Sequence, residues 1–265
     1  MIFELEDVTV ELAGRTALRN LRLAIRPGER VALLGVNGAG KSTLLKLLDG
    51  LVFPGRGSIR WKGERLDEKA LAGAAFRRRF RSAVGLVFQN VDAMLFHPTV
   101  FDEIAFGPRQ LGVGDVDARV RDWASRFGIE GLLDRPPFEL SGGEKRRVAL
   151  AAVLALGPEV LLLDEATAGL DPASQALLVD LLEGLPELTV VASTHDVSLA
   201  SDLGTRAILL APDRAGVLYD GPPAALFRDH ALLVESGLAH RHAHRHDGTR
   251  HDHFHLHAGD VPVEG

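Results

Sequence analysis

The sequence predicts an α/β fold with a mostly parallel β-sheet, an N-terminal antiparallel β part and an inserted helical subdomain. Four apolar runs are short enough to be buried strands and alternate with segments of helical composition: residues 31–34, 84–88, 160–163 and 188–194. Strands that alternate with helices favour a parallel sheet. The 265 residues are enough for one large domain or two small ones, with a substantial buried core.

The other elements follow from local composition. Three short strands are expected before the first buried strand, at residues 2–5, 8–12 and 21–25. Residues from 90 to about 157 form the expected helical subdomain, because prolines interrupt a segment that is otherwise helical in composition. A later helix is expected from about Pro172 to Leu182. We assign residues 1–238 to one nucleotide-binding domain and residues 239–265 to a histidine-rich, metal-binding tail that we expect to be disordered.

Composition and charge exclude several classes of protein. The hydrophobic fraction of 46% and charged fraction of 25% are ordinary for a globular protein. The net charge of −6 argues against a general nucleic-acid-binding protein, and we expect no nucleic-acid partner. Cysteine is absent, which excludes disulfides and thiolate metal sites and fits a reducing compartment.

No apolar run is long enough for a membrane span. The longest, Val148–Leu156, has nine residues, whereas a spanning helix needs about 20. The first residues show neither the basic start nor the apolar core of a signal peptide. If the protein acts at a membrane, we therefore expect it to be a peripheral subunit.

A phosphate-binding loop follows the first buried strand and precedes a helix-forming segment. Its residues are Gly35, Val36, Asn37, Gly38, Ala39, Gly40, Lys41, Ser42 and Thr43. The glycines let successive N–H groups point into one concavity, and the helix N-terminus adds partial positive charge there. Lys41 can reach the outer phosphates, and the Ser42 hydroxyl can bind Mg²⁺. The strand, loop and helix together indicate a P-loop NTPase with a RecA-like sheet.

Four polar residues follow later predicted strands at their carboxyl ends: Gln89, Asp164, Glu165 and His195. Ligands bind at this edge of parallel sheets, so we expect these residues and the loop to face one nucleotide. Phosphoryl transfer needs positioning, charge neutralisation and an oriented nucleophile. Asp164 is expected to hold Mg²⁺ together with Ser42, and Glu165 to act as the base for the attacking water. His195 is expected to donate a hydrogen bond to the γ-phosphate.

A second glycine-containing motif runs from Ser141 to Glu144, before a basic turn and a long apolar helix. Ser141 and Glu144 match a capping box, in which the two side chains satisfy N–H groups at the start of a helix. A capping box does not require glycine at the two positions between. Gly142 and Gly143 would let a phosphate from outside approach the helix N-terminus closely.

These motifs, in this order, resemble those of ATP-binding-cassette (ABC) ATPases over roughly residues 2–230. The resemblance implies that Ser141, Gly142 and Gly143 contact ATP bound to a second ATPase subunit. ATP would then lie between two subunits of a head-to-tail homo- or heterodimer. Asp171, which the residues alone predict as a helix N-cap, resembles the loop that crosses between the two sites.

The segment around Gln89 narrows the resemblance. Gln89 resembles the family's switch glutamine, which senses Mg²⁺ and the attacking water and moves with the membrane partner. Residues 84–90 and 95–108 look like the energy-coupling-factor branch of the family and the cobalt and nickel importers within it. Two departures from the family pattern are Leu12, where an aromatic residue usually stacks on adenine, and Glu144, where glutamine is usual.

The resemblance to this branch implies that the protein is the ATP-hydrolysing subunit of a membrane importer, with ATP and Mg²⁺ as cofactors. Cobalt or nickel is the expected substrate, and a vitamin is the alternative. The implied partners are an integral membrane coupling subunit, reached through the helical region after Gln89, and a substrate-binding membrane subunit. The implied location is the cytoplasmic face of the cell membrane.

Eight histidines gather near the end of the chain: His240, His242, His244, His246, His251, His253, His255 and His257. In an extended chain their spacing of two places four imidazoles on one side. Such a set can bind Ni²⁺, Co²⁺, Cu²⁺ or Zn²⁺, more weakly as the pH falls toward about 6.5. The alternative is a disordered, solvated tail with a chance bias in composition; the irregular spacers argue against a purification tag.

Two other classes of P-loop protein fit the sequence less well. Soluble nickel-delivery GTPases also combine a P-loop with histidine tracts, but their guanine-selective motif Asn-Lys-x-Asp does not occur here. ABC-type DNA-repair ATPases separate the P-loop from the signature by a long coiled coil, whereas Lys41 and Ser141 are 100 residues apart.

Overall fold

The computed structural model describes residues 1–165, 167, 169–211, 216–246 and 249–256, with side chains described as far as residue 239. The chain consists of two compact units. The first unit comprises Met1–Ile25, Glu29–Arg65 and Val191–Gly265, and the second comprises Arg26–Gly28 and Leu66–Val190. The predicted boundary between a domain ending at residue 238 and a tail stays a prediction.

The first unit contains an antiparallel sheet with the strand order β2-β1-β4-β5. Its strands are β1 (Phe3–Leu12), β2 (Arg15–Ile25), β4 (Arg56–Trp61) and β5 (Glu64–Arg65). Phe3 is fully buried and pairs with Ile25 on one side and Trp61 on the other. The expected antiparallel β part is therefore present.

One detail of that prediction is wrong. The two short strands expected at 2–5 and 8–12 are a single strand, β1, interrupted by a shift of register between Leu5 and Val8. Asp7 takes a left-handed backbone conformation (φ 50°) at this irregularity. The bulge breaks the alternation of buried and exposed residues, which is why the sequence pattern resembles two strands.

The same unit holds the strand that leads into the glycine-rich loop. β3 (Arg30–Leu34) pairs in parallel with β9 (Arg206–Leu210), which pairs antiparallel with β10 (Val217–Gly221). The helices of this unit are α1 (Lys41–Leu48), α8 (Ala200–Leu203), α9 (Pro223–Arg228) and α10 (His230–Glu235). Apolar residues of β3, β9 and the last two helices share one buried core, which includes Leu34, Leu209, Leu226 and Leu233.

The second unit contains strands β6 (Val84–Val87) and β7 (Val160–Leu163), the start of β8 (Thr189–Thr194), and several helices. β6 pairs in parallel with β7, and both strands are buried along their whole length, as expected for apolar runs in a parallel sheet. β8 begins in this unit and ends in the first. The helices are α2 (Glu68–Ala72), α3 (Ala74–Ala83), α4 (Val100–Leu111), α5 (Val116–Arg126), α6 (Gly142–Leu154) and α7 (Pro172–Glu183).

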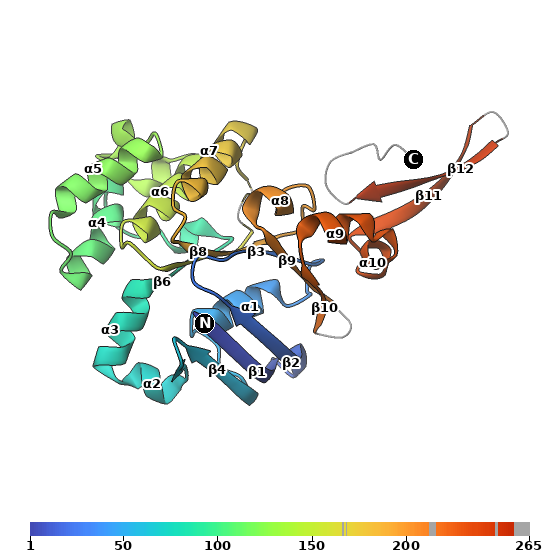
Figure 1. The fold of residues 1–265 in the computed structure, drawn as a ribbon. Coiled ribbons are helices and arrows are strands. Elements are labelled where there is room, and N and C mark those ends of the chain that lie inside the picture. The colour runs from blue at the N-terminus through green and yellow to red at the C-terminus, as the bar shows by residue number, and fades with distance from the viewer. Residues whose placement is uncertain (166, 168, 212–215, 247–248, 257–265) are drawn as a thin grey trace. The chain divides into compact units, whose positions relative to one another are not determined.

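A helical region lies between β6 and β7, where the sequence predicts one. α4, α5 and α6 pack on one another (green in Figure 1). The 3₁₀ turn η1 (Val91–Ala93) precedes α4, and the turns η2 (Glu130–Leu132) and η3 (Pro137–Glu139) lie between α5 and α6. Pro108 lies inside α4, in its last turn. The expectation that this proline interrupts the helix is therefore wrong. Within the described residues, no helix is long and apolar enough to cross a membrane.

The histidine-rich segment forms two strands, β11 (Ala239–His246) and β12 (Thr249–Leu256), which pair antiparallel. The register places His240 opposite His255, His242 opposite His253 and His244 opposite His251. This hairpin is a feature that the sequence analysis does not predict. His257 lies outside the described residues.

Candidate functional site

The glycine-rich loop leads from β3 into α1. Gly40 precedes the first residue of α1 and has a φ of 99°, in the left-handed region. A Cβ at this position would lie 2.7 Å from the main-chain oxygen of Ala17 and 3.0 Å from Leu18 Cδ2, so the loop requires glycine here. Among the described residues, no side chain caps α1 and no acidic residue lies in its first turn. Such a helix N-terminus favours an anionic ligand.

The Lys41 side chain folds back onto this loop. Its Nζ donates to the main-chain oxygen of Gly35 at 2.6 Å and to that of Val36 at 3.3 Å, and the residue is only 6% exposed. The positive charge is therefore held against the loop that is predicted to bind phosphate. Ser42, the second residue of α1, continues the same segment. The predicted set from Gly35 to Thr43 is thus one loop-to-helix element whose charge and backbone fit a nucleoside triphosphate.

His195 lies in the same unit, directly after β8. The Thr194 hydroxyl accepts a hydrogen bond from the N–H of Asp196 at 3.0 Å, which fixes a bend of the chain at His195. The imidazole is exposed. A histidine at the end of a strand can donate a hydrogen bond to a ligand, and the role of His195 toward the γ-phosphate stays a prediction.

The other strand-end residues lie in the second unit. The N–H of Asp164 donates to the main-chain oxygen of Val87 at 2.9 Å, so the pairing of β6 and β7 continues up to the acidic pair. Asp164 and Glu165 are 6% and 7% exposed, respectively, and Gln89 is exposed. Glu165 has a φ of 52°, an uncommon conformation for a residue other than glycine. Two strand ends therefore bring Gln89 and the acidic pair together, as predicted.

Arg146 is a site residue that the sequence analysis does not identify. It lies in α6, is 3% exposed, and donates through Nη1 to the main-chain oxygen of Gln89 at 3.3 Å. Its Nη2 donates to the main-chain oxygens of Asp164, at 3.2 Å, and Glu165. Burial lowers the pKa of the Arg146 guanidinium, and the negative charges of Asp164 and Glu165 oppose this effect.

A signal for Arg146 does exist in the sequence. Positions 146, 149, 150 and 153 follow the i, i+3, i+4, i+7 spacing of one helix face, and the other three are apolar. All four are buried in the structure. An arginine in line with core residues implies hydrogen-bond acceptors inside the protein, because a buried charge needs partners.

The second glycine motif forms the predicted capping box at the start of α6. The Ser141 hydroxyl accepts the N–H of Glu144 at 3.4 Å, while the N–H of Ser141 donates to the Glu144 carboxylate at 2.8 Å. A Cβ added at Gly142 or Gly143 would meet nothing within 4 Å among the described residues. Because the chain's own packing requires glycine at neither position, the open space there fits the close approach of a ligand from outside.

Asp171 is the N-cap of α7, as predicted. Its carboxylate accepts the N–H of Ser174 at 3.0 Å and the Ser174 hydroxyl at 2.7 Å. These hydrogen bonds lower the pKa of the Asp171 carboxyl. The residue is exposed, so a second role at a subunit interface stays a prediction.

The structure thus describes two groups of predicted residues. The first unit holds the loop and His195. The second holds Gln89, Asp164, Glu165, the capping-box motif and Asp171. That both groups surround one nucleotide stays a prediction. Leu12 is 41% exposed at the end of β1, and its place at the family's adenine-stacking position stays a prediction.

Comparison with known proteins decides the family. The ABC transporter family matches residues 18–168, more than half of the chain. The chain belongs to this family. It is 46% identical to the nickel import ATP-binding protein NikO of Rhodobacter capsulatus, over 89% of this chain and 95% of NikO. It is also 46% identical to the cobalt import ATP-binding protein CbiO of the same organism, over 85% of this chain and 80% of CbiO.

A solved structure supports the same family assignment. cbiO1 from Clostridium perfringens, described as part of the ABC transporter complex cbiONQ, has a TM-score of 0.74 and 32% sequence identity to this chain. The match covers 89% of this chain and 94% of cbiO1. The predicted fold is confirmed: a P-loop ABC ATPase with an antiparallel sheet and a mixed sheet flanked by helices. As a member of this family, the chain is an ATPase that uses ATP with Mg²⁺.

Proposed function

We propose that this ABC ATPase is the peripheral subunit of a membrane importer for cobalt or nickel ions, bound at the cytoplasmic face of the membrane. The observation that carries the proposal is the near full-length similarity to a nickel import and a cobalt import ATP-binding protein. A vitamin importer of the energy-coupling-factor branch is the second candidate, because the sequence motifs around Gln89 are shared by the whole branch.

At the nucleotide site, the loop N–H groups and Lys41 bind the outer phosphates. Ser42, Gln89 and Asp164 are the residues that would hold Mg²⁺, which neutralises charge on the phosphates when bound. Glu165 accepts the proton of the attacking water, and His195 donates to the γ-phosphate. The buried positions of Lys41 and of the acidic pair support these roles, because charges act more strongly where water is excluded.

The functional unit is a dimer of ATPase subunits, either identical or different. Ser141, Gly142 and Gly143 complete the site of the other subunit, and Asp171 lies at the crossing between the two sites. The exposed Ser141 hydroxyl at a helix N-terminus and the open space beside both glycines support this arrangement.

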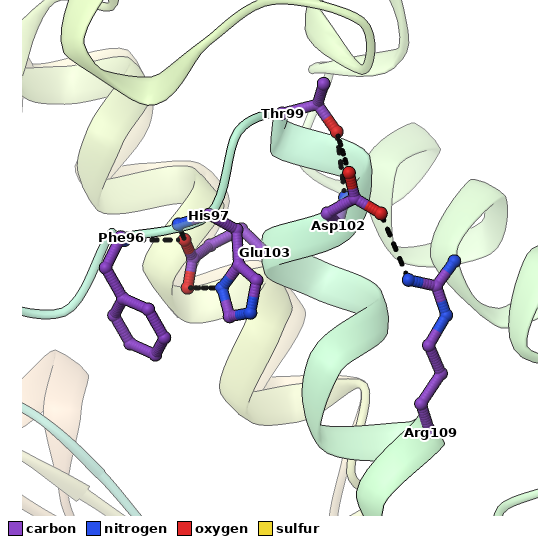
Figure 2. A network of polar contacts seen from close by, with 6 residues as sticks. All are labelled: Phe96, His97, Thr99, Asp102, Glu103 and Arg109. Carbon is purple, nitrogen blue, oxygen red and sulfur yellow. Dashed lines mark hydrogen bonds and ion pairs between the residues drawn. The ribbon is translucent and has the colours of Figure 1, made fainter.

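The loop between η1 and α4 is proposed to meet the membrane coupling subunit. Phe96 and Phe106 are 69% and 41% exposed, and their ring centroids lie 5.8 Å apart. The centroid of the His97 ring lies 4.4 Å from that of Phe96 and 4.6 Å from that of Phe106. Phe96, His97 and Phe106 form an aromatic cluster, and Figure 2 shows how Glu103 supports two of its members, Phe96 and His97. One carboxylate oxygen accepts the N–H groups of Phe96 and His97, both at 2.8 Å, and the other lies 3.3 Å from His97 Nδ1. An exposed aromatic cluster on a fixed loop suits docking to another protein.

The histidine-rich hairpin is proposed to bind a transition metal such as Ni²⁺, Co²⁺ or Zn²⁺. The backbone register sets His240, His242 and His244 opposite His255, His253 and His251, at alternate positions of each strand, and this pairing supports the proposal. Two neighbouring pairs supply four imidazoles, the number that satisfies a divalent ion of this series. Equilibrium dialysis with Ni²⁺ should show binding to the full chain and none to a chain ending at Ala239. Equal binding to both chains would contradict the proposal.

The transport proposal is tested on the native complex. The chain is tagged at its N-terminus and purified from solubilised membranes of its own cells; its partners are identified by mass spectrometry and bound metal by elemental analysis. Integral membrane subunits that contain cobalt or nickel support the proposal. A bound vitamin supports the second candidate. Recovery from the soluble fraction with no membrane protein would overturn both and favour a metal-delivery NTPase.

A further inference from the structure

Arg146 connects the helix that begins at Ser141 with the two strand ends that carry Gln89 and the acidic pair. It lies five residues after Ser141, about 7.5 Å further along the helix axis. Its two Nη atoms donate to three main-chain oxygens, those of Gln89, Asp164 and Glu165. The planar, forked guanidinium is suited to this task, because it presents several donors in fixed directions.

The acceptors of these bonds are main-chain oxygens rather than the carboxylates. Arg146 therefore orients the backbone of Asp164 and Glu165, and its positive charge also lies close enough to interact with both carboxylates. Its buried neighbours on the same helix face, at positions 149, 150 and 153, are apolar. An apolar side chain would be enough to fill the space that Arg146 occupies. The buried charge of Arg146 therefore indicates a specific hydrogen-bonding task.

The backbone at Glu165 is the point most sensitive to this support. With a φ of 52°, the residue adopts a left-handed conformation that is unfavourable for glutamate and persists only where the surroundings enforce it. The direction of the carboxylate follows from that conformation. The hydrogen bond from Nη2 to the Glu165 oxygen holds the turn, and a shift of α6 would move both together.

We propose that Arg146 is a positioning residue for hydrolysis, which aligns the base Glu165 and the switch residue Gln89 according to the position of the helix that begins at Ser141. The inference rests on the proposed function, in which Ser141 contacts ATP bound to a second subunit. Occupancy of one site then adjusts the base of the other through a single side chain. ATP binding at the two sites is coupled to hydrolysis by this route.

The test compares variants of the full-length chain. Arg146→Lys keeps the positive charge but loses the fork, and Arg146→Gln removes the charge. Arg119→Lys is the matched control, because Arg119 Nη1 donates to the main-chain oxygen of Ala155 at 3.0 Å, at the other end of α6. ATP hydrolysis is measured against ATP concentration, and the binding of a non-hydrolysable ATP analogue with Mg²⁺ is measured separately.

For Arg146→Lys we expect kcat to fall about tenfold or more, since small misplacements of catalytic groups can lower rates by about a hundredfold. Analogue binding should stay within about threefold of the unsubstituted chain, because the lost interaction concerns the transition state. If the two sites are coupled as proposed, the rate of the unsubstituted chain depends sigmoidally on ATP concentration, and Arg146→Lys should lose this shape. Arg146→Gln should be slower still, and Arg119→Lys should keep both rate and sigmoidal shape.

Three results would overturn the inference. The first is an unchanged kcat in both Arg146 variants. The second is an equal loss of kcat and analogue binding, which would make Arg146 a structural support of the whole site. The third is failure of both Arg146 variants to bind the analogue while Arg119→Lys binds it. Failure of the proposed function is distinguishable, because the unsubstituted chain would then lack ATP hydrolysis or dimer formation.

Discussion

The hydroxyl of Ser141 donates a hydrogen bond to the carboxylate of Glu144 at 2.7 Å, in addition to the 2.8 Å bond from the Ser141 N–H to the same oxygen. These bonds lower the pKa of the Glu144 carboxyl. In the proposed dimer, the same hydroxyl has to turn toward a phosphate of the other subunit. The negative charge of Glu144 therefore competes with ATP for Ser141 and repels the phosphate.

Glu144→Gln tests this competition. The amide still accepts from Ser141, but a neutral acceptor holds the hydroxyl less strongly than a carboxylate. We expect ATP-induced dimers to form at severalfold lower ATP concentration, and the free energy of unfolding to fall by about 0.5 kcal/mol through loss of charge at the helix N-terminus. Analytical ultracentrifugation at increasing ATP measures the first effect. A higher ATP requirement in the variant would contradict the competition.

The requirement for glycine in the phosphate-binding loop is testable at two neighbouring positions. Gly40→Ala places a Cβ 2.7 Å from the Ala17 oxygen and should lower the free energy of unfolding by about 2–4 kcal/mol and abolish ATP binding. Gly38→Ala is the control, because its φ is also positive (85°) but no described atom lies within 4 Å of the added Cβ. For Gly38→Ala, thermal denaturation should show that the free energy of unfolding falls by only about 1 kcal/mol, the cost of the backbone strain alone. Equal losses would argue against the close contact at Gly40.

Glu103 is predicted to hold the aromatic cluster in place. Glu103→Ala leaves the N–H groups of Phe96 and His97 without their acceptor and should lower the free energy of unfolding by about 2 kcal/mol. Glu103→Gln keeps an acceptor and should lose less than half of that. Phe96→Ala, at an exposed position, should leave stability and ATP hydrolysis unchanged but reduce recovery of membrane subunits in the co-purification. Full recovery with Phe96→Ala would exclude this residue from the contact with those subunits.

Asp171 gives a prediction for acid conditions. Its pKa is lowered in the folded chain by the hydrogen bonds from Ser174, so the ionised form is favoured by folding. The stabilisation is fully present above the ordinary pKa of about 3.9 and is lost as the pH falls through the lowered value. Asp171→Asn keeps a capping oxygen and removes this titration. Its melting temperature should lie below that of the unsubstituted chain at pH 7 and converge with it near pH 2; a constant difference would contradict the assignment.

The sequence was most informative where function depends on a short continuous segment. The loop from Gly35 to Thr43, the capping box at Ser141 and the N-cap at Asp171 are local motifs, so spacing alone predicts them. Strand ends were also predictable, since runs such as Val160–Leu163 are buried throughout. The family resemblance, now confirmed, added the assignment of ATP as the nucleotide.

The features that were missed depend on contacts between distant parts of the chain. Arg146 donates to residues 18, 19 and 57 positions away, and its burial is hidden in a basic run that reads as an exposed turn. The bulge at Asp7 is set by pairing with two neighbouring strands, so the pattern of β1 alone suggests two strands. Pro108 lies inside α4, although proline in a helix usually predicts an interruption.

Glu165 is predicted to be the base for hydrolysis. Glu165→Gln removes the proton acceptor but keeps the size of the side chain, and should lower kcat by at least about a hundredfold. ATP binding and ATP-induced dimer formation should persist, because neither requires proton transfer. Turnover similar to that of the unsubstituted chain would refute the assignment of the base.

The same variant allows the most direct measurement of the central claim, which is that two subunits enclose ATP between the phosphate-binding loop of one and Ser141 of the other. A structure of Glu165→Gln with ATP and Mg²⁺ should show Ser141 Oγ within hydrogen-bond distance, about 2.5–3.0 Å, of a phosphate oxygen bound by the other subunit. A structure in which ATP and Mg²⁺ are bound and Ser141 faces no nucleotide of a second subunit would contradict it.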